Sequence, residues 1–203
     1  MVQQVEKEGI QALHQQSKHM IKTKSDLREW LALDLARYGE EKPTLSDMIL
    51  HNEKWYLWQY VKALRHVEYY TNSGRRGLLF YFWWYRYKHL GARTRCKVSP
   101  NTTGPGLVIY HIGDYTGVKP SARIGKNCTL RAGVVIGRRF DETGDGLPAI
   151  IGDNVNFGLG VKVFGRVTIG NNVSIGANSV VTHDIPDNAV VGGIPARVIR
   201  INE

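Results

Sequence analysis

Cysteine is scarce in this chain of 203 residues, in which only Cys96 and Cys128 occur. Two cysteines so far apart supply neither a disulfide framework nor the paired spacing of a zinc site, so we expect a reducing cytoplasm and no metal. Long hydrophobic runs are also missing, because the most apolar stretch, residues 78–87, is too short to span a bilayer. The first 20 residues are polar and do not resemble a secretory signal peptide.

Acidic residues are too few to balance the basic ones, and the formal net charge is +9. The imbalance is uneven: residues 1–100 contain 17 Lys and Arg against 10 Asp and Glu, whereas the remainder contains 10 against 8. Such a surface can attract nucleic acid, an anionic membrane or a phosphorylated ligand. No compact basic run with interleaved aromatics occurs, so we expect a solvated helical surface and no nucleic-acid partner, with membrane contact as an alternative.

The sequence does contain an apolar residue at every sixth position. This residue recurs in two runs, at Ile112, Val118, Ile124, Leu130 and Ile136, then at Ile151, Phe157, Val163, Ile169, Ile175 and Val181. Period six fits neither a helix nor a plain strand, and it is typical of a parallel β-helix whose stacked coils bury a continuous column. An ordinary β-sandwich would need hairpin turns that this spacing does not provide.

Before the repeats, apolar residues recur at the spacing of a helix. We expect one helix from Ser25 to Gly39 and a second from about Ser46 to Tyr70, with Leu50 on the buried face of the second. The aromatic segment 78–87 is expected to pack between helices, and an interfacial aromatic belt is the alternative.

These segments predict an α+β chain with a helical domain over residues 1–97, a β-helix over 98–192 and a C-terminal tail over 193–203. The repeat is interrupted between Ile136 and Ile151, so a loop of residues 138–149 must leave the coil. Loops on a regular solenoid often carry the binding face. The loop's acids, Asp141, Glu142 and Asp145, could form a carboxylate pair or a metal site, or simply be solvated.

His111 is the histidine with the most informative position. It directly precedes the inward-pointing Ile112, so its own side chain should project outward at a corner of the coil. An exposed imidazole titrates near neutrality and can act as a general base, although a single histidine can also be structural.

The two cysteines have different settings. Cys128 occupies a small inward position of the repeat, which indicates packing. Cys96 has Arg95 and Lys97 beside it, and these cations could lower the pKa of its thiol.

Together these features resemble the hexapeptide-repeat acyltransferases, and within them the serine acetyltransferase type. The resemblance rests on the helical N-terminal region, residues 100–106 leading into Ile109-Tyr110-His111, the repeats, the loop sequence at 144–148 and the closing segment 191–197.

The resemblance implies a left-handed three-sided prism that forms a homotrimer, which can pair into larger assemblies through its helices. It implies acetyl-CoA in the groove between neighbouring prisms and no metal. The matching histidine, His111, would deprotonate an acceptor hydroxyl. The family's cofactor contacts correspond to Gly137, Leu159, Gly165 and Ala177 along the pantetheine arm, with Arg197 and Arg200 near the phosphates.

Some positions depart from the serine acetyltransferase pattern. The acid that precedes the catalytic histidine in the family is Tyr110 here, and the Arg-His pair before the loop proline is replaced at residues 146–147. The aspartate that orients the imidazole is also missing, because Lys97 or Val98 lies near its place. Asp114 is the candidate to replace it.

These departures leave three functions open. The first is acetyl transfer to L-serine, and the second is acetyl transfer to a saccharide hydroxyl, as in surface polysaccharide synthesis. The third is a non-catalytic β-helical scaffold that docks partners. A gamma-class carbonic anhydrase is disfavoured, because His111 has no companion histidines in the coils at zinc-ligand spacing.

Overall fold

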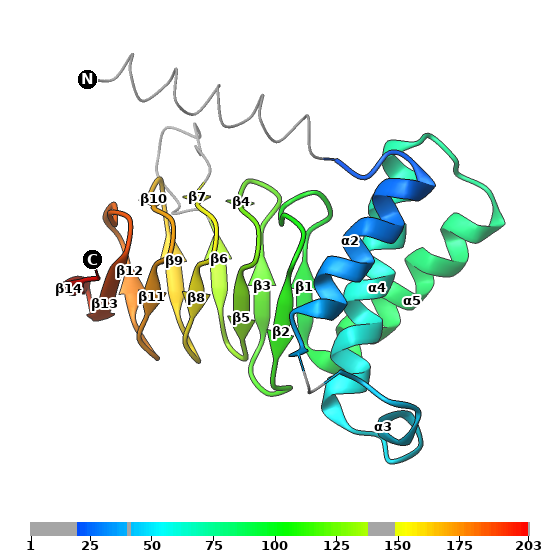
Figure 1. The fold of residues 1–203 in the computed structure, drawn as a ribbon, viewed down its shortest axis with the longest axis horizontal. Coiled ribbons are helices and arrows are strands. Elements are labelled where there is room, and N and C mark those ends of the chain that lie inside the picture. The colour runs from blue at the N-terminus through cyan, green and yellow to red at the C-terminus, as the bar shows by residue number, and fades with distance from the viewer. Residues whose placement is uncertain (1–19, 40–41, 138–148, 203) are drawn as a thin grey trace.

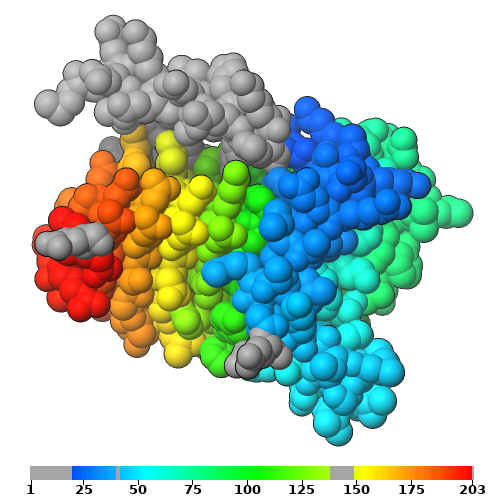
Figure 2. Space-filling model, viewed as in Figure 1, coloured from blue at the N-terminus to red at the C-terminus, as the bar shows by residue number. Residues whose placement is uncertain are grey.

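The computed structural model describes residues 20–39, 42–137 and 149–202, and it places a group of helices at one end of a column of short strands (Figure 1). The helices are α2 (Lys24–Ala36), α3 (Leu45–Ile49), α4 (Glu53–Asn72) and α5 (Leu78–Thr94). In the space-filling view the helices cover one end of the column (Figure 2).

The cap of α2 lies two residues before the predicted cap at Ser25. Thr23 caps α2, because its hydroxyl accepts from the Asp26 N–H at 3.1 Å while the Asp26 carboxylate accepts from the Thr23 N–H at 2.8 Å. This reciprocal capping box satisfies two backbone donors that the helix leaves unpaired.

The single helix predicted over residues 46–70 is two helices, α3 and α4. The chain turns at His51, whose φ of 56° lies in the left-handed region and cannot continue a right-handed helix. Leu50 is 70% exposed, so the prediction that it lies on the buried face was wrong.

Helix α5 is much more exposed than the sequence predicted. Leu78 is 89% exposed and Tyr85 is 64% exposed, and only Tyr87, Leu90 and Thr94 are buried. The segment is apolar on all sides, but α4 covers only one stripe of it, so packing between helices was the wrong prediction for most of its aromatic residues.

The strands form the three faces of a prism. The first face is β1 (Cys96–Val98), β3 (Thr116–Val118), β6 (Val135–Gly137), β9 (Lys162–Phe164) and β12 (Val180–Val181). The second is β4 (Arg123–Ile124), β7 (Ile150–Ile151) and β10 (Thr168–Ile169). The third is β2 (Val108–Tyr110), β5 (Thr129–Arg131), β8 (Asn156–Phe157), β11 (Ser174–Ile175), β13 (Ala189–Gly193) and β14 (Ala196–Ile201).

The sixth-residue positions form the prism core, as predicted. Phe157 and Leu130 have no exposed surface, and the other repeated residues are also buried, except Ile112, which is partly buried against the same core. Strands pair in parallel on each face, for example Val118 opposite Ile136 and Ile136 opposite Val163, so the same position of each coil stacks on the next.

The boundaries differ from the expected ones at both ends of the prism. The first coil begins with β1 at Cys96, and residues 196–201 are not a tail but strand β14, which pairs antiparallel with β13. The last coil of a β-helix leaves a row of unpaired backbone groups, and β14 covers that edge. Apart from Ala149, the predicted loop 138–149 and its acids lie outside the described residues.

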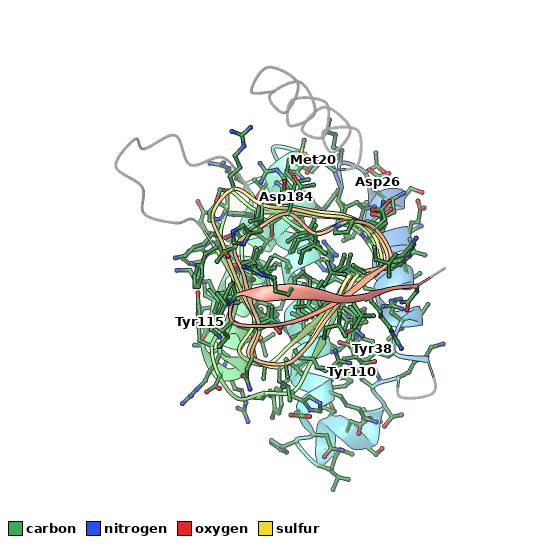
Figure 3. The ribbon with its side chains drawn as sticks, turned by 90° about the vertical axis from the view of Figure 1, so that its left-hand side faces the viewer. Met20, Asp26, Tyr38, Tyr110, Tyr115 and Asp184 are labelled. Atoms are coloured by element: carbon green, nitrogen blue, oxygen red, sulfur yellow. The ribbon has the colours of Figure 1, made fainter. Side chains whose placement is uncertain are left out.

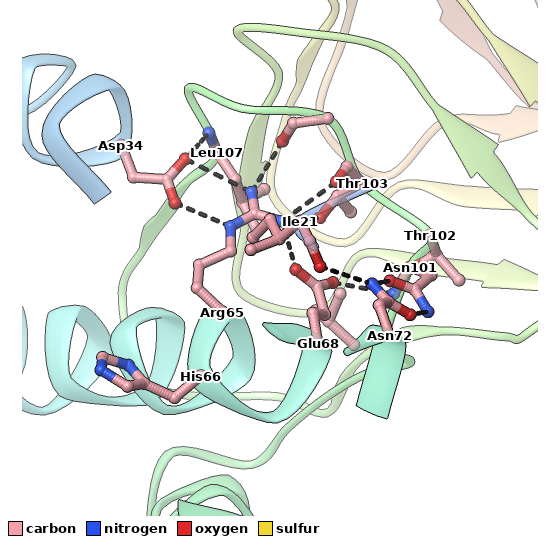
Figure 4. Close-up of polar contacts among 12 residues, drawn as sticks. Ile21, Asp34, Arg65, His66, Glu68, Asn72, Asn101, Thr102, Thr103 and Leu107 are labelled. Carbon is pink, nitrogen blue, oxygen red and sulfur yellow. Dashed lines mark hydrogen bonds and ion pairs between the residues drawn. The ribbon is translucent and has the colours of Figure 1, made fainter. Parts of the chain in front are cut away.

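A buried arginine joins the helices to the first coil (Figure 4). Arg65 of α4 has no exposed surface, and its Nε donates to the Asp34 carboxylate of α2 at 2.8 Å. Its other nitrogens donate to Glu68 at 3.0 Å and to the carbonyl oxygens of Thr103 and Gly104 at 3.0 and 2.7 Å. Burial disfavours the charged guanidinium, but the two carboxylates outweigh it and raise the pKa of Arg65.

The two carboxylates continue this network into the coil. Asp34 accepts from the Leu107 N–H, and Glu68 accepts from the Asn101 N–H, each at 2.8 Å. Burial raises the pKa of Glu68, and the charge of Arg65 opposes that shift. Every charged group in the cluster therefore has a partner, which a buried ion pair needs to be tolerated.

Candidate active site

His111 lies in the turn between β2 and β3, at an edge of the prism. Its φ is 67°, so the chain leaves the strand direction at this residue and turns toward the next coil. The side chain is 56% exposed, which confirms the prediction that it projects outward.

A carboxylate from the helical region contacts this turn. Glu53 is the first residue of α4, and its Oε1 lies 3.0 Å from Nδ1 of His111. Its Oε2 accepts from the Ile112 N–H at 2.9 Å, so one carboxylate holds both the ring and the backbone beside it. The first turn of a helix also favours an acidic residue through the helix dipole.

The contact with Glu53 defines what the imidazole can do. An ionised carboxylate only accepts hydrogen bonds, so the proton of a neutral ring lies on Nδ1 and the lone pair on Nε2. A ring held in this tautomer by a carboxylate is the arrangement of a general base. The sequence analysis missed Glu53, because 58 residues separate it from His111 and no local pattern connects them.

Asp114, the residue predicted to orient the imidazole, does not contact the ring of His111 through a hydrogen bond in the described part of the chain. The ring nitrogen instead contacts Glu53. Asp114 contributes its backbone carbonyl to the stack, where it accepts from the Gly133 N–H at 3.3 Å.

Tyr110 makes one wall of the site aromatic. Its ring packs edge-on against the buried Tyr38, with the centroids 6.0 Å apart, and the two lie close together in the view along the prism (Figure 3). The position that carries an acid in the serine acetyltransferase pattern therefore supplies packing here.

The residues expected to contact a cofactor divide between two edges. Leu159 and Ala177 lie in the turns after β8 and β11, on the same edge as His111, and Leu159 is 46% exposed. Gly137 and Gly165 lie on the next edge, where the Gly165 N–H donates to the Gly137 carbonyl at 3.3 Å. The face β1-β3-β6-β9-β12 lies between these two edges.

The two arginines expected near phosphates are both on β14. Arg197 pairs with Gly192 and Arg200 pairs with Val190 in the terminal hairpin, and both side chains are exposed. They lie at the far end of the prism from the helices (Figure 1).

Both thiols are buried, and burial decides their chemistry. Burial raises the pKa of Cys96 to about 11 and that of Cys128 to about 12. The packing predicted for Cys128 is confirmed. The expectation that neighbouring cations lower the pKa of Cys96 was wrong, because desolvation of the thiolate dominates.

A metal site requires several ligating side chains close together, and a membrane span requires a long apolar helix. Within ranges 20–39, 42–137 and 149–202, no three His, Cys, Asp or Glu side chains gather in a way that could hold a metal ion. No helix in these same ranges has both the length and the apolar character to cross a bilayer.

A model of one known family matches the repeats. Residues 112–138, 148–183 and 166–193 match the family described as hexapeptide repeat of succinyl-transferase. The matched segments together make up less than half of the chain.

The relatives of this chain include serine acetyltransferases. It is 45% identical to the serine acetyltransferase of Staphylococcus xylosus over 108 residues, which are 53% of this chain and 49% of that protein. The chain thus spans about half the length of the curated relatives it matches. These similarities confirm the resemblance to the serine acetyltransferase type.

Solved structures agree with the predicted fold, a helical region followed by a left-handed β-helix. The serine acetyltransferase of Neisseria gonorrhoeae matches with a TM-score of 0.69 and 26% identity, over 89% of this chain and 69% of that one. The serine acetyltransferase of Brucella abortus in complex with coenzyme A matches with a TM-score of 0.70 and 23% identity, over 94% and 74%.

Proposed function

We propose that this protein is an acetyl-CoA-dependent O-acetyltransferase with His111 as its general base. The observation that carries the proposal is the Glu53–His111 pair, 3.0 Å apart on an exposed edge of the prism. The similarity to serine acetyltransferases, one of them solved with coenzyme A, supports acetyl-CoA as the co-substrate.

In the proposed reaction, Nε2 of His111 takes the proton of the acceptor hydroxyl as the oxygen attacks the carbonyl carbon of the acetyl thioester. The tetrahedral intermediate collapses, the C–S bond breaks, and the proton passes from His111 to the leaving sulfur. The products are the acetyl ester of the acceptor and free coenzyme A. A positioned base of this kind contributes about 10²- to 10⁴-fold in rate, and Glu53, rather than Asp114, fixes its tautomer.

The proposed place for acetyl-CoA is the surface of the prism next to His111. Leu159 and Ala177 on its edge, and Gly137 and Gly165 on the next edge, would line the pantetheine arm. In a homotrimer, edges of two neighbouring prisms would enclose this arm, and the exposed Arg197 and Arg200 would attract the phosphates. Light scattering should then give about three times the chain mass of 22.9 kDa.

Release of coenzyme A tests the transfer. The protein is incubated with acetyl-CoA and either L-serine, the acceptor in the relatives' names, or nucleotide sugars, and free thiol is measured. We expect release with one acceptor class, a loss of at least about a hundredfold in His111→Ala, and no loss in His183→Ala, which removes an exposed histidine from the last coil.

Two results would contradict the proposal. One is the absence of release with every acceptor, and the other is equal release by the wild-type protein and His111→Ala. If calorimetry also detects no binding of coenzyme A, the non-catalytic scaffold becomes the better explanation of the fold.

A further inference from the structure

A cavity of about 540 Å³ lies where α5 meets the first coil of the prism. Helix α5 contributes Tyr87 and Lys88, the segment around β1 contributes Arg95 and Lys97, and the turn before β3 contributes Tyr115. This volume falls in the range of about 300–1,000 Å³ that is usual for small-molecule sites.

Three cations line this cavity without a counter-charge in the described part of the chain. Among the described residues, Lys88, Arg95 and Lys97 form no salt bridge, and no acidic residue lines the cavity. The sequence explains why, because it has no Asp or Glu between Glu68 and Asp114. Lysine and arginine side chains bind carboxylates and phosphates through charge-assisted hydrogen bonds.

The cavity adjoins the turn that carries His111. Tyr115 is the last residue of that turn, and Nη1 of Arg95 donates to the Gly113 carbonyl in its middle at 3.5 Å. Four residues of extended chain span at most about 14 Å, so Tyr115 at the cavity wall lies within that distance of His111 along the backbone.

We infer that this cavity binds the carboxylate or phosphate of a saccharide acceptor and so holds one of its hydroxyls at His111. The inference rests on the proposed acetyl transfer and narrows its acceptor to an anionic sugar. The residues expected to contact acetyl-CoA lie on β6 and in the coils that follow it, whereas the cavity lies at the helical end, so it is left free for the acceptor. Free serine would fill only a small part of it.

Calorimetric titration with matched probes tests the site. The full chain is titrated at low salt with glucuronate and glucose 1-phosphate as anionic probes and with glucose as the neutral one. Lys97→Gln removes a charge from the cavity, and Lys126→Gln removes one exposed charge from another corner of the prism. We expect an anionic probe to bind, glucose not to bind, and Kd to rise about five- to tenfold in Lys97→Gln alone.

Equal affinities in the wild-type protein and in a Lys88→Gln/Lys97→Gln double variant would overturn the inference, and so would the absence of binding by both anionic probes. Displacement of the probe by coenzyme A would assign the cavity to the co-substrate and overturn it as well. Probe binding does not require acetyl transfer. If the probes bind but no coenzyme A is released with any acceptor, the proposed function is wrong and the binding site is not. If coenzyme A is released but the KM for the acceptor is the same in Lys97→Gln as in the wild-type protein, this inference alone is wrong.

Discussion

The imidazole of His111 contacts a carboxylate from a helix 58 residues earlier in the chain. Both side chains are about half exposed, at 56% and 47%, so the pair faces solvent where a substrate can approach it. The same carboxylate also accepts a backbone N–H of the turn, which fixes the position of the ring as well as its tautomer.

Replacing Glu53 with Gln should therefore slow catalysis through His111. We expect kcat to fall by at least about tenfold, because the amide carries no charge to stabilise the imidazolium that forms in the transition state. Glu29→Gln, which changes an exposed acid of α2, should leave kcat unchanged. Coenzyme A release gives both values.

A double-mutant cycle separates this positioning role from a structural one. Once His111 is alanine, Glu53→Gln should cost no further activity, because two residues that act as a unit are not additive. If Glu53→Gln lowers the residual activity of His111→Ala by the same factor as in the wild-type protein, Glu53 acts through the fold and not through the ring.

The two thiols should be inert in the folded protein. Burial raises the pKa of Cys96 from 9.0 to about 11 and that of Cys128 to about 12, so each holds less thiolate than a free thiol at pH 8. A shift of two pKa units lowers the thiolate fraction roughly a hundredfold. Mass spectrometry after iodoacetamide treatment should show slow labelling that rises with pH, and fast labelling of both cysteines in denaturant. Labelling of native Cys96 as fast as in denaturant would contradict its burial.

At the scale of the elements, one corner of the prism is built from a ladder of asparagines. Asn127, Asn154, Asn172 and Asn188 all have φ between 56° and 60°. Asn154 accepts from the Asn127 side-chain amide at 3.2 Å and donates to Asn172 at 2.9 Å. Asparagine tolerates the left-handed region better than most residues, so it both turns the corner and joins the coils.

Two substitutions of Asn154 should separate these contributions. Glycine removes the ladder bonds but accepts the positive φ, whereas alanine removes the bonds and is also strained. We expect Asn154→Ala to lower the free energy of unfolding by about 1 kcal/mol more than Asn154→Gly, measured by denaturant titration. Equal losses would mean that the backbone conformation contributes nothing measurable.

The sequence predicted some elements correctly and others not. Period six predicted the prism core, and Phe157 and Leu130 are buried as expected. The prediction that α5 packs between helices was wrong for most of its aromatic residues, because a helix that is apolar on every side does not show which side another element covers. The left-handed turn at His51, which divides the second helix, also has no apolar pattern to reveal it.

At the scale of the whole molecule, Arg65 joins two helices to the first coil. It contacts Asp34, Glu68 and the carbonyl oxygens of residues 103 and 104, all in the interior (Figure 4). Because these partners lie on α2, α4 and the prism, the orientation of the helical region on the prism depends on this side chain.

Replacing Arg65 with Met should destabilise the whole chain. The substitution leaves Asp34 and Glu68 buried without their counter-charge, and breaking a buried pair in this way costs about 3–5 kcal/mol. Arg28→Met, on the exposed side of α2, should change the free energy of unfolding by less than about 0.5 kcal/mol. Denaturant unfolding compares the two variants, and similar losses would show that the buried cluster adds no net stability.

The sequence by itself determined the prism and the outward direction of His111. Both follow from a local steric rule, in which each coil repeats the same inward position and the next coil covers it. The tertiary structure alone decided that Glu53 meets His111, that three cations line one cavity and that residues 196–201 form a covering strand. Those contacts join residues far apart in the chain, and they depend on how the helices sit on the first coil and how the chain end folds back on the last.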